Sequence, residues 1–244
     1  MAPSFDKQNT KLMQGLALHQ QGKLSEARKL YEDFLRLQPR SADGLHLLGI
    51  VLAQLKQYER AINAFDNAIK INSNNSTFYC NRGNALFELT KFDESINNYE
   101  SAINLAPEYV EAHFNKGNAY YSIGQFEQAI LSYEQVIRLS PDHLLAWKRQ
   151  ADSLARLDKY QESILSLDQV IILCPDDAEA YYHKGVAYDA IKQSDLAIEN
   201  YQQAIQINPN YIDALNNLGI LLSATEKYEE ALDAFRKIIV INPG

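Results

Sequence analysis

Apolar residues recur along the chain with the spacing of amphipathic helices, and the whole pattern repeats every 34 residues. In 110–143 one face carries His113, Gly117 and Tyr120, and a second carries Ala129, Tyr133 and Val136. Intervals of four and three residues place each set on one side of a helix. The pattern predicts two helices in every period.

Proline and glycine mark the same period. Prolines 39, 107, 141, 175, 209 and 243 are separated by 34 residues or a multiple of 34, and glycines 15, 49, 83, 117, 185 and 219 keep one phase. We predict repeats over 8–41, 42–75, 76–109, 110–143, 144–177, 178–211 and 212–244, after a flexible segment over 1–7. Proline disfavours helix in the residue before it, so each second helix should end there. The polar residues that follow are expected N-caps: Asn74, Asp142, Asp176 and Asn210.

Small and aromatic positions alternate within each repeat, numbered here from its first residue. Small residues at positions 8 and 20 should let the two helices approach, while large residues at positions 4, 11, 17 and 24 fill the space around them. The fifth repeat departs from this rule with Ala151 at position 8 and Leu167 at position 24. This departure, and Ser194 in the sixth repeat, indicate local specialisation.

These positions resemble the tetratricopeptide repeat, whose consensus places Gly at 8, Tyr at 11, Ala at 20, an aromatic residue at 24 and Pro at 32. The resemblance covers 8–244. It implies an all-α, right-handed α-solenoid of seven helix-turn-helix repeats, with about fourteen helices, because a single helix pair cannot bury its own apolar face. It also implies a concave groove lined by the first helix of each repeat, at positions 2, 5, 6, 9, 12 and 13.

Composition excludes several classes of function. The 244 residues carry 23 Lys+Arg and 31 Asp+Glu, a net charge of −8, which argues against a nucleic-acid partner. No apolar run is long enough for membrane insertion, the first residues lack a signal-peptide core, and two cysteines cannot form a disulfide framework. We therefore expect a cytoplasmic protein.

Sequence signatures of catalysis are missing. The chain has no phosphate-binding loop, HExxH motif or CxxC pair, and its five histidines are spread over four repeats. These observations favour a protein that is not an enzyme and that binds no metal or cofactor. The expected function is a scaffold that binds an extended peptide segment of a protein partner between Asn81 and Asn217.

Asparagines gather at the expected groove positions: Asn81, Asn84, Asn115 and Asn118, with Asn217 farther along. An amide side chain both donates to and accepts from a peptide backbone, so these residues are candidates for gripping it. The alternative is that asparagine is only the family's common residue there. Hydrogen bonds of about 0.5–1.5 kcal/mol each need apolar support, for which the candidates are Phe87, Phe114, Tyr121 and Tyr182.

Basic residues form a second candidate feature in the fifth repeat. Lys148, Arg149 and Arg156 share one helix face and could receive a carboxylate of the partner. The alternative is internal pairing, because Lys148, Asp152 and Arg156 follow an i, i+4, i+8 spacing. His183 occupies a groove position of the sixth repeat.

One specialised site of the family is not expected. Chaperone adaptors that resemble this chain clamp a C-terminal carboxylate with asparagines, an arginine and two lysines. Asn84, Asn115 and Arg149 match three of these slots, but Cys80 and Leu145 stand in the two lysine slots. We expect the clamp to be absent.

The C-terminal edge is apolar, with Val240 at a position that is polar in most other repeats. A solenoid should not leave such an edge in water. Because Gly244 ends a repeat, we expect the natural chain to continue, which suits an alternative function as the interaction arm of a larger enzyme such as a bacterial O-GlcNAc-transferase-like glycosyltransferase. Self-association, as in a structural assembly module, or a partner protein would also cover this edge.

Overall fold

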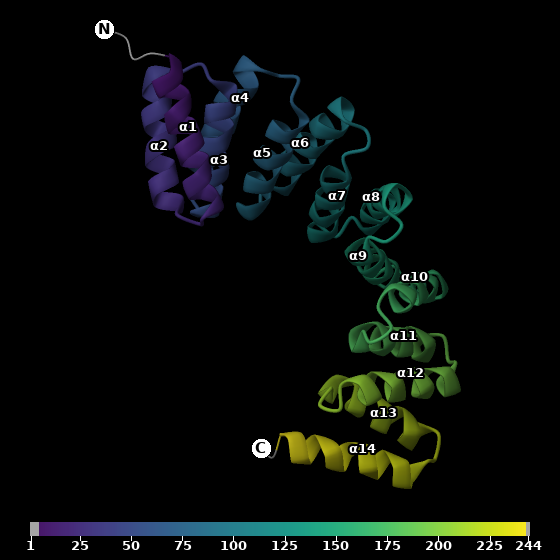
Figure 1. The fold of residues 1–244 in the computed structure, drawn as a ribbon. Coiled ribbons are helices and arrows are strands. Elements are labelled where there is room, and N and C mark those ends of the chain that lie inside the picture. Colours follow the sequence, from purple (N-terminus) through teal and green to yellow (C-terminus); the bar gives the residue numbers. More distant parts are fainter. Residues whose placement is uncertain (1–4, 243–244) are drawn as a thin grey trace. The chain divides into compact units, whose positions relative to one another are not determined.

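The computed structural model describes the backbone of residues 5–242 and the side chains of residues 10–242, and these residues form fourteen α-helices and no strand (Figure 1). The first helices of the seven repeats are α1 (Phe5–Gln20), α3 (Ala42–Gln54), α5 (Ser76–Glu88), α7 (Val110–Ser122), α9 (Leu144–Ala155), α11 (Ala178–Ala190) and α13 (Ile212–Ala224). The second helices are α2 (Leu24–Leu37), α4 (Tyr58–Ile71), α6 (Phe92–Leu105), α8 (Phe126–Leu139), α10 (Tyr160–Leu173), α12 (Ser194–Ile207) and α14 (Tyr228–Ile241). The predicted all-α fold is confirmed.

The helices divide into two compact units, Met1–Gln125 with α1–α7 and Phe126–Gly244 with α8–α14. Within each unit every helix packs against the next one along the chain. In the N-terminal unit, first helices also contact one another, α3 with α5 and α5 with α7. The boundary between the units falls inside the fourth predicted repeat.

The predicted flexible segment over 1–7 lies partly outside the described residues, which exclude 1–4. Residues 5–7 belong to α1, so the first helix begins before the predicted repeat boundary at residue 8.

Glycine at position 8 allows close packing against an aromatic ring at position 24, as the sequence predicted. A Cβ atom added to Gly49 would lie 2.5 Å from Phe65 Cε1, and one added to Gly83 would lie 2.6 Å from Tyr99 Cε1. Real Cβ atoms do not approach other atoms this closely, so any larger residue would have to push the ring away. The core of every repeat with this pair depends on the missing methyl group.

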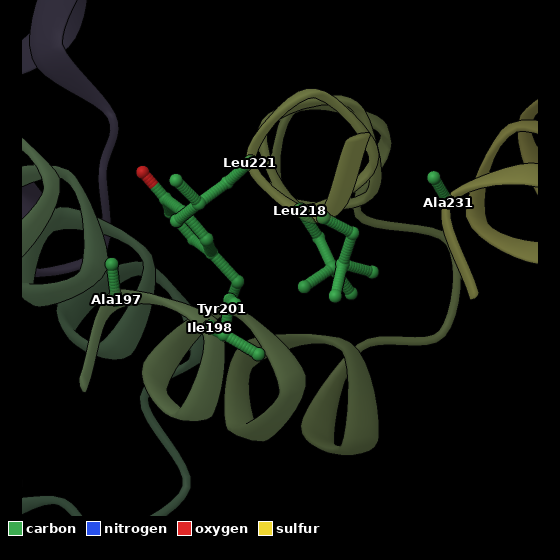
Figure 2. Packing of buried hydrophobic residues seen from close by; sticks show 7 residues of the cluster. Ala197, Ile198, Tyr201, Leu218, Leu221 and Ala231 are labelled. Atoms are coloured by element: carbon green, nitrogen blue, oxygen red, sulfur yellow. The ribbon is translucent and has the colours of Figure 1, made fainter. Parts of the chain in front are cut away.

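Figure 2 shows the core where the sixth repeat meets the seventh. The ring of Tyr201 rises from α12 toward Leu221 of α13, while Leu218 points into the space above α12. Each of these three side chains is at least nine-tenths buried. Aromatic side chains therefore form the core between successive repeats as well as within one.

Every repeat turns from its first to its second helix through one residue in the left-handed region, at position 15. Its φ lies between 57° and 75° at Gly22, Lys56, Thr90, Gly124, Asp158, Lys192 and Glu226. The following N–H bonds the carbonyl five residues back, as Gln57 N does to Leu52 O at 2.8 Å. This is the Schellman pattern of helix C-termini. The backbone closes the turn, and only two of the seven residues are glycines.

The predicted N-caps are displaced by one residue. Asn75 and Asp177 cap α5 and α11, accepting from Thr77 N at 3.0 Å and Ala180 N at 3.1 Å, whereas Asn74 and Asp176 precede the caps. The corresponding residues of α9 and α13 are His143 and Tyr211, so Asp142 and Asn210 are likewise one position early. A two-residue turn accounts for the shift, because it begins at the repeat proline, or at Ser73 before α5, and includes the residue that was predicted as the cap.

Candidate peptide-binding face

The predicted groove positions lie on the first helices, and each unit has a cavity on that side. In the N-terminal unit a cavity of about 520 Å³ opens between residues of α3, α5 and α7 and the adjoining turn and core. Its lining is Ala53, Gln54, Lys56, Tyr58, Asn84, Ala85, Phe87, Glu88, Tyr99, Asn115 and Asn118. Four predicted site residues, Asn84, Phe87, Asn115 and Asn118, are thus brought together.

Asn84 is the centre of a hydrogen-bond network in this cavity. Its Oδ1 accepts from Asn115 Nδ2 at 2.9 Å and from the Tyr99 hydroxyl at 3.0 Å, while its Nδ2 lies 3.4 Å from Glu111 Oε1. The carbonyl of Asn84 is therefore already engaged within the fold. The hydrogen bond to Asn84 gives the Asn115 side chain a structural role, and its binding of a peptide stays a prediction.

Asn81 interacts with His46 of the preceding repeat. Its Nδ2 lies 2.8 Å from His46 Nε2, and since an amide nitrogen only donates, the ring nitrogen accepts. The imidazole also contacts the rings of Phe65 and Phe78, with centroids 5.7 and 4.6 Å away. Burial lowers the pKa of His46 to about 4, against the opposing effect of Asp43. The histidine is neutral at physiological pH and supports Asn81.

Cys80 fills one of the lysine slots of the carboxylate clamp, and the structure buries it completely. Desolvation, followed by the nearby Glu111, raises the pKa of its thiol to about 12, although a hydrogen bond with Tyr109 acts in the opposite direction. A buried neutral thiol cannot replace an exposed lysine. The sequence-based expectation that this clamp is absent agrees with the chemistry of the slot.

The apolar candidates of the N-terminal unit lie on α5 and α7. Phe87 packs edge-on against Phe92, with ring centroids 5.2 Å apart. Phe114 and Tyr121 are half-buried on α7. All three residues are partly exposed, as an anchor requires.

The C-terminal unit has a cavity of about 360 Å³ between α9, α10 and α11. Its lining is Leu145, Lys148, Arg149, Ala151, Asp152, Ala155, Tyr160, Ser163, Leu167, Glu179, Ala180, His183, Val186 and Ala187. Three predicted site residues, Lys148, Arg149 and His183, are brought together here.

Lys148 of α9 forms ion pairs with two carboxylates at the start of α11. Its Nζ lies 2.6 Å from Asp177 Oδ2 and 3.0 Å from Glu179 Oε2. Burial alone would lower the pKa of Lys148, but the bonds to the two carboxylates outweigh it and raise that pKa. Internal pairing therefore does occur, although its partners lie at the start of α11 and not in the i, i+4, i+8 series along α9.

Arg156 lies apart from His183. Arg156 stacks over the ring of Phe126, 5.4 Å from its centroid, outside the cavity lining. His183 Nε2 lies 3.9 Å from Glu179 Oε1 at the cavity rim.

Tyr182 and Asn217 form a further cluster. The Tyr182 ring packs against Tyr211 and Tyr201 with centroids 5.0 and 6.0 Å away, and Asn217 Nδ2 lies 3.4 Å from its hydroxyl oxygen. Burial, assisted by Glu179 and neighbouring groups, raises the pKa of Tyr211 to about 12. Tyr182 is thus half-buried in an aromatic cluster with Tyr201 and Tyr211, and its role as an anchor stays a prediction.

Several lining residues were missing from the sequence-based set. Glu179 and Leu145 occupy groove position 2, and Tyr58 and Tyr160 occupy position 17, which the pattern assigned to the core. Position 2 was an expected groove position, so its residues were available to sequence reasoning. Position 17 was not an expected groove position. It begins the second helix, and its side chain reaches the cavity beside the turn between the two helices.

The apolar C-terminal edge is exposed in the part of the chain that the structure describes. Val240 is 81% and Ile239 is 64% exposed on α14. A cover for this edge, by a partner or a second copy, stays a prediction.

Among the residues that the structure describes, no helix combines the length and apolar character needed to cross a bilayer. Between residues 10 and 242, no group of three His, Cys, Asp or Glu side chains is arranged to hold a metal ion.

Comparison with known structures confirms the architecture. The C-terminal part of a TPR repeat-containing protein from Cytophaga hutchinsonii superposes with a TM-score of 0.86, covering 95% of each chain at 17% identity. YrrB, described as a TPR protein with an unusual peptide-binding site, gives 0.65 over 75% of this chain and 94% of its own at 23% identity. MamA gives 0.66 over 69% and 92% at 28% identity.

Sequence comparison gives the same family. Profiles described as tetratricopeptide repeat match 12–76, 110–143, 178–211 and 200–233, and one described as TPR repeat matches 83–124. Curated protein sequences give no match. With helix pairs, glycine–ring packing and matched profiles in agreement, the chain belongs to the tetratricopeptide repeat family.

Proposed function

We propose that this protein is a non-enzymatic scaffold whose first helices bind an extended segment of a partner protein. The observation that carries the proposal is the position of the two cavities. One opens beside α5 and α7 and the other beside α9 and α11, and both are lined at the groove positions expected from the repeat. YrrB, described as a TPR protein with an unusual peptide-binding site, supports the proposal because it has the same fold.

The chemistry of the linings suits a peptide. Asn115 and Asn118 bring amides to the N-terminal cavity, and these can pair with backbone groups of any sequence. Phe87 adds apolar contact at the same place. In the C-terminal unit an apolar floor with a charged rim resembles the general pattern of ligand sites, in which a few polar groups fix orientation.

The proposal is tested by selecting twelve-residue peptides from a random display library against the purified chain and titrating them calorimetrically. We expect enriched peptides, and we expect Asn81→Ala combined with Asn115→Ala to weaken them at least about tenfold, or 1.4 kcal/mol, without loss of helicity. The matched control, Asn63→Ala with Asn97→Ala, alters two exposed asparagines of the second helices and should leave affinity unchanged. Groove binding would be contradicted if no peptide were enriched, or if the control double variant lost as much affinity as Asn81→Ala with Asn115→Ala.

A further inference from the structure

The cavity of the C-terminal unit has an unusual origin in the sequence. In the first, second, third, sixth and seventh repeats, a glycine at position 8 lies against an aromatic ring at position 24. The pairs are Gly15–Tyr31, Gly49–Phe65, Gly83–Tyr99, Gly185–Tyr201 and Gly219–Phe235. In the fifth repeat the pair is Ala151–Leu167, and both residues line the cavity.

The two substitutions depend on each other. Since an added Cβ lies 2.5–2.7 Å from the nearest ring atom in those five pairs, the methyl group of Ala151 is incompatible with a ring in the usual place. Leu167 avoids this collision, and it remains buried together with Ala151. A leucine does not extend as far as a tyrosine or phenylalanine ring, so the space beyond it is open to the first-helix side.

The loss of the ring also changes the polarity of the site. In the third repeat the Tyr99 hydroxyl reaches the first-helix face and bonds Asn84 there. Leu167 carries no hydroxyl, and the floor of its cavity consists of Ala151, Ala155, Ala180, Val186 and Ala187 beside it. Small side chains such as these leave a broad apolar surface.

The rim does not favour a charged occupant. Lys148 and Arg149 are balanced by Asp152 and Glu179 among the lining residues, and Lys148 is held between Asp177 and Glu179. A partner carboxylate would have to compete with these two groups for the same ammonium. An uncharged side chain avoids that competition and gains apolar contact with the floor.

We propose that this cavity receives one aromatic side chain of the bound partner, in the place where the repeat lacks its own ring. The inference rests on the proposed function and adds the residue class that gives it specificity. An aromatic ring can lie flat on the alanine side chains of the floor. It has the same volume as the aromatic side chain that the other repeats carry at position 24. The polar rim admits the peptide backbone on either side.

The test uses the full chain with ¹³C-labelled alanine methyl groups, titrated with N-acetyl-phenylalanine amide, N-acetyl-leucine amide and N-acetyl-aspartate amide in NMR experiments. We expect the phenylalanine probe to shift the methyl signals of Ala151, Ala155, Ala180 and Ala187 saturably. It should bind roughly fivefold more tightly than the leucine probe. Tighter binding of the leucine or aspartate probe would overturn the proposed occupant, and the absence of saturable shifts would overturn the site.

Variants separate cavity binding from other causes. Ala151→Gly with Leu167→Tyr restores the packing of the other repeats, fills the cavity and should abolish the shifts, whereas Ala151→Gly alone should keep them. Ala155→Phe adds a ring to the cavity lining from the half-buried Ala155 of α9, leaves the core pair unchanged and should also abolish binding. The proposal would be contradicted if the phenylalanine probe still bound both to the folded double variant Ala151→Gly with Leu167→Tyr and to folded Ala155→Phe.

The outcome is distinguishable from that of the proposed function. If library peptides bind and respond to the asparagine variants but ignore Ala155→Phe, only the aromatic pocket fails. If the phenylalanine probe binds and no library peptide does, the scaffold proposal fails while the pocket stands.

Discussion

Asn115 donates a hydrogen bond from Nδ2 to Asn84 Oδ1 over 2.9 Å, linking the first helices of the third and fourth repeats. Because the Tyr99 hydroxyl donates to the same oxygen, one carbonyl joins two first helices and a second helix. The amides that look like peptide-binding groups therefore also hold the repeats in register.

The first prediction concerns this network. We expect Asn84→Ala and Asn115→Ala to be coupled in a double-mutant cycle of urea unfolding, with an interaction free energy of about 0.5–1.5 kcal/mol, because each removes the same bond. Additive effects would show that the bond contributes nothing in solution.

Lys148 gives a second prediction. The Asp177 side chain is only 10% exposed, so Lys148→Met would leave a largely buried carboxylate without its cation. We expect a loss of about 1–3 kcal/mol in the free energy of unfolding. The control is Lys192→Met in an exposed turn, which should change stability by less than about 0.5 kcal/mol. Equal effects would mean that the ion pair is dispensable.

His46 gives a pH prediction. Its pKa is about 4 in the folded chain and near 6.5 in a free side chain. The unfolded state therefore binds more protons between these values, so stability falls as the pH drops from about 6.5 to 4 and is fully present above that window. In thermal melts, His46→Gln should reduce this part of the pH dependence. An unchanged profile in the variant would assign the dependence to carboxylates.

The two cysteines should differ in reactivity. Cys80 is fully buried with its pKa raised to about 12, whereas Cys174 is half-exposed. A hydrogen bond to Asp176 also raises the pKa of Cys174, which slows its reaction but does not block access. We expect a thiol reagent to modify Cys174 alone in the native chain and both cysteines in denaturant, as read by mass spectrometry. Rapid native labelling of Cys80 would contradict the packing of α5.

The turn residue Thr90 provides a stability prediction. Its φ of 58° is unfavourable for a β-branched residue. Thr90→Gly should relieve the strain and raise the free energy of unfolding by about 0.5–1 kcal/mol, after the greater flexibility of glycine in the unfolded chain is counted. Gly124→Thr, the reverse change at the equivalent turn, should destabilise by a similar amount. Thermal melts in which the two variants do not change the stability in opposite directions would refute this account.

Sequence periodicity was sufficient for the helices and the main packing rule. Position 8 predicted the close approach that Gly49 and Phe65 show, because intervals of three and four residues define a helix face independently of tertiary context. The caps were less accurate: Asp176 was expected and Asp177 was found. The turn after proline is short enough that one residue decides which side chain reaches the free N–H groups.

The partners of the site residues were harder to predict. Lys148 suggested a pairing along its own helix, but its partners, Asp177 and Glu179, lie about one repeat later in the chain. In a stack of repeats the nearest charged neighbour is often one period away, and a view of a single helix omits it. The sequence likewise did not predict the cavity beside Leu167, although Ala151 and Leu167 were both recognised as departures from the repeat pattern.

The left-handed turn residues of the seven repeats are all exposed, and their side chains take no part in closing the turns. They therefore provide one exposed labelling position in each repeat. Cysteines introduced at two of these positions, in a variant without Cys80 and Cys174, would carry spin labels. The distance between the two labels, measured with and without a bound peptide, would report whether binding changes the spacing of the repeats.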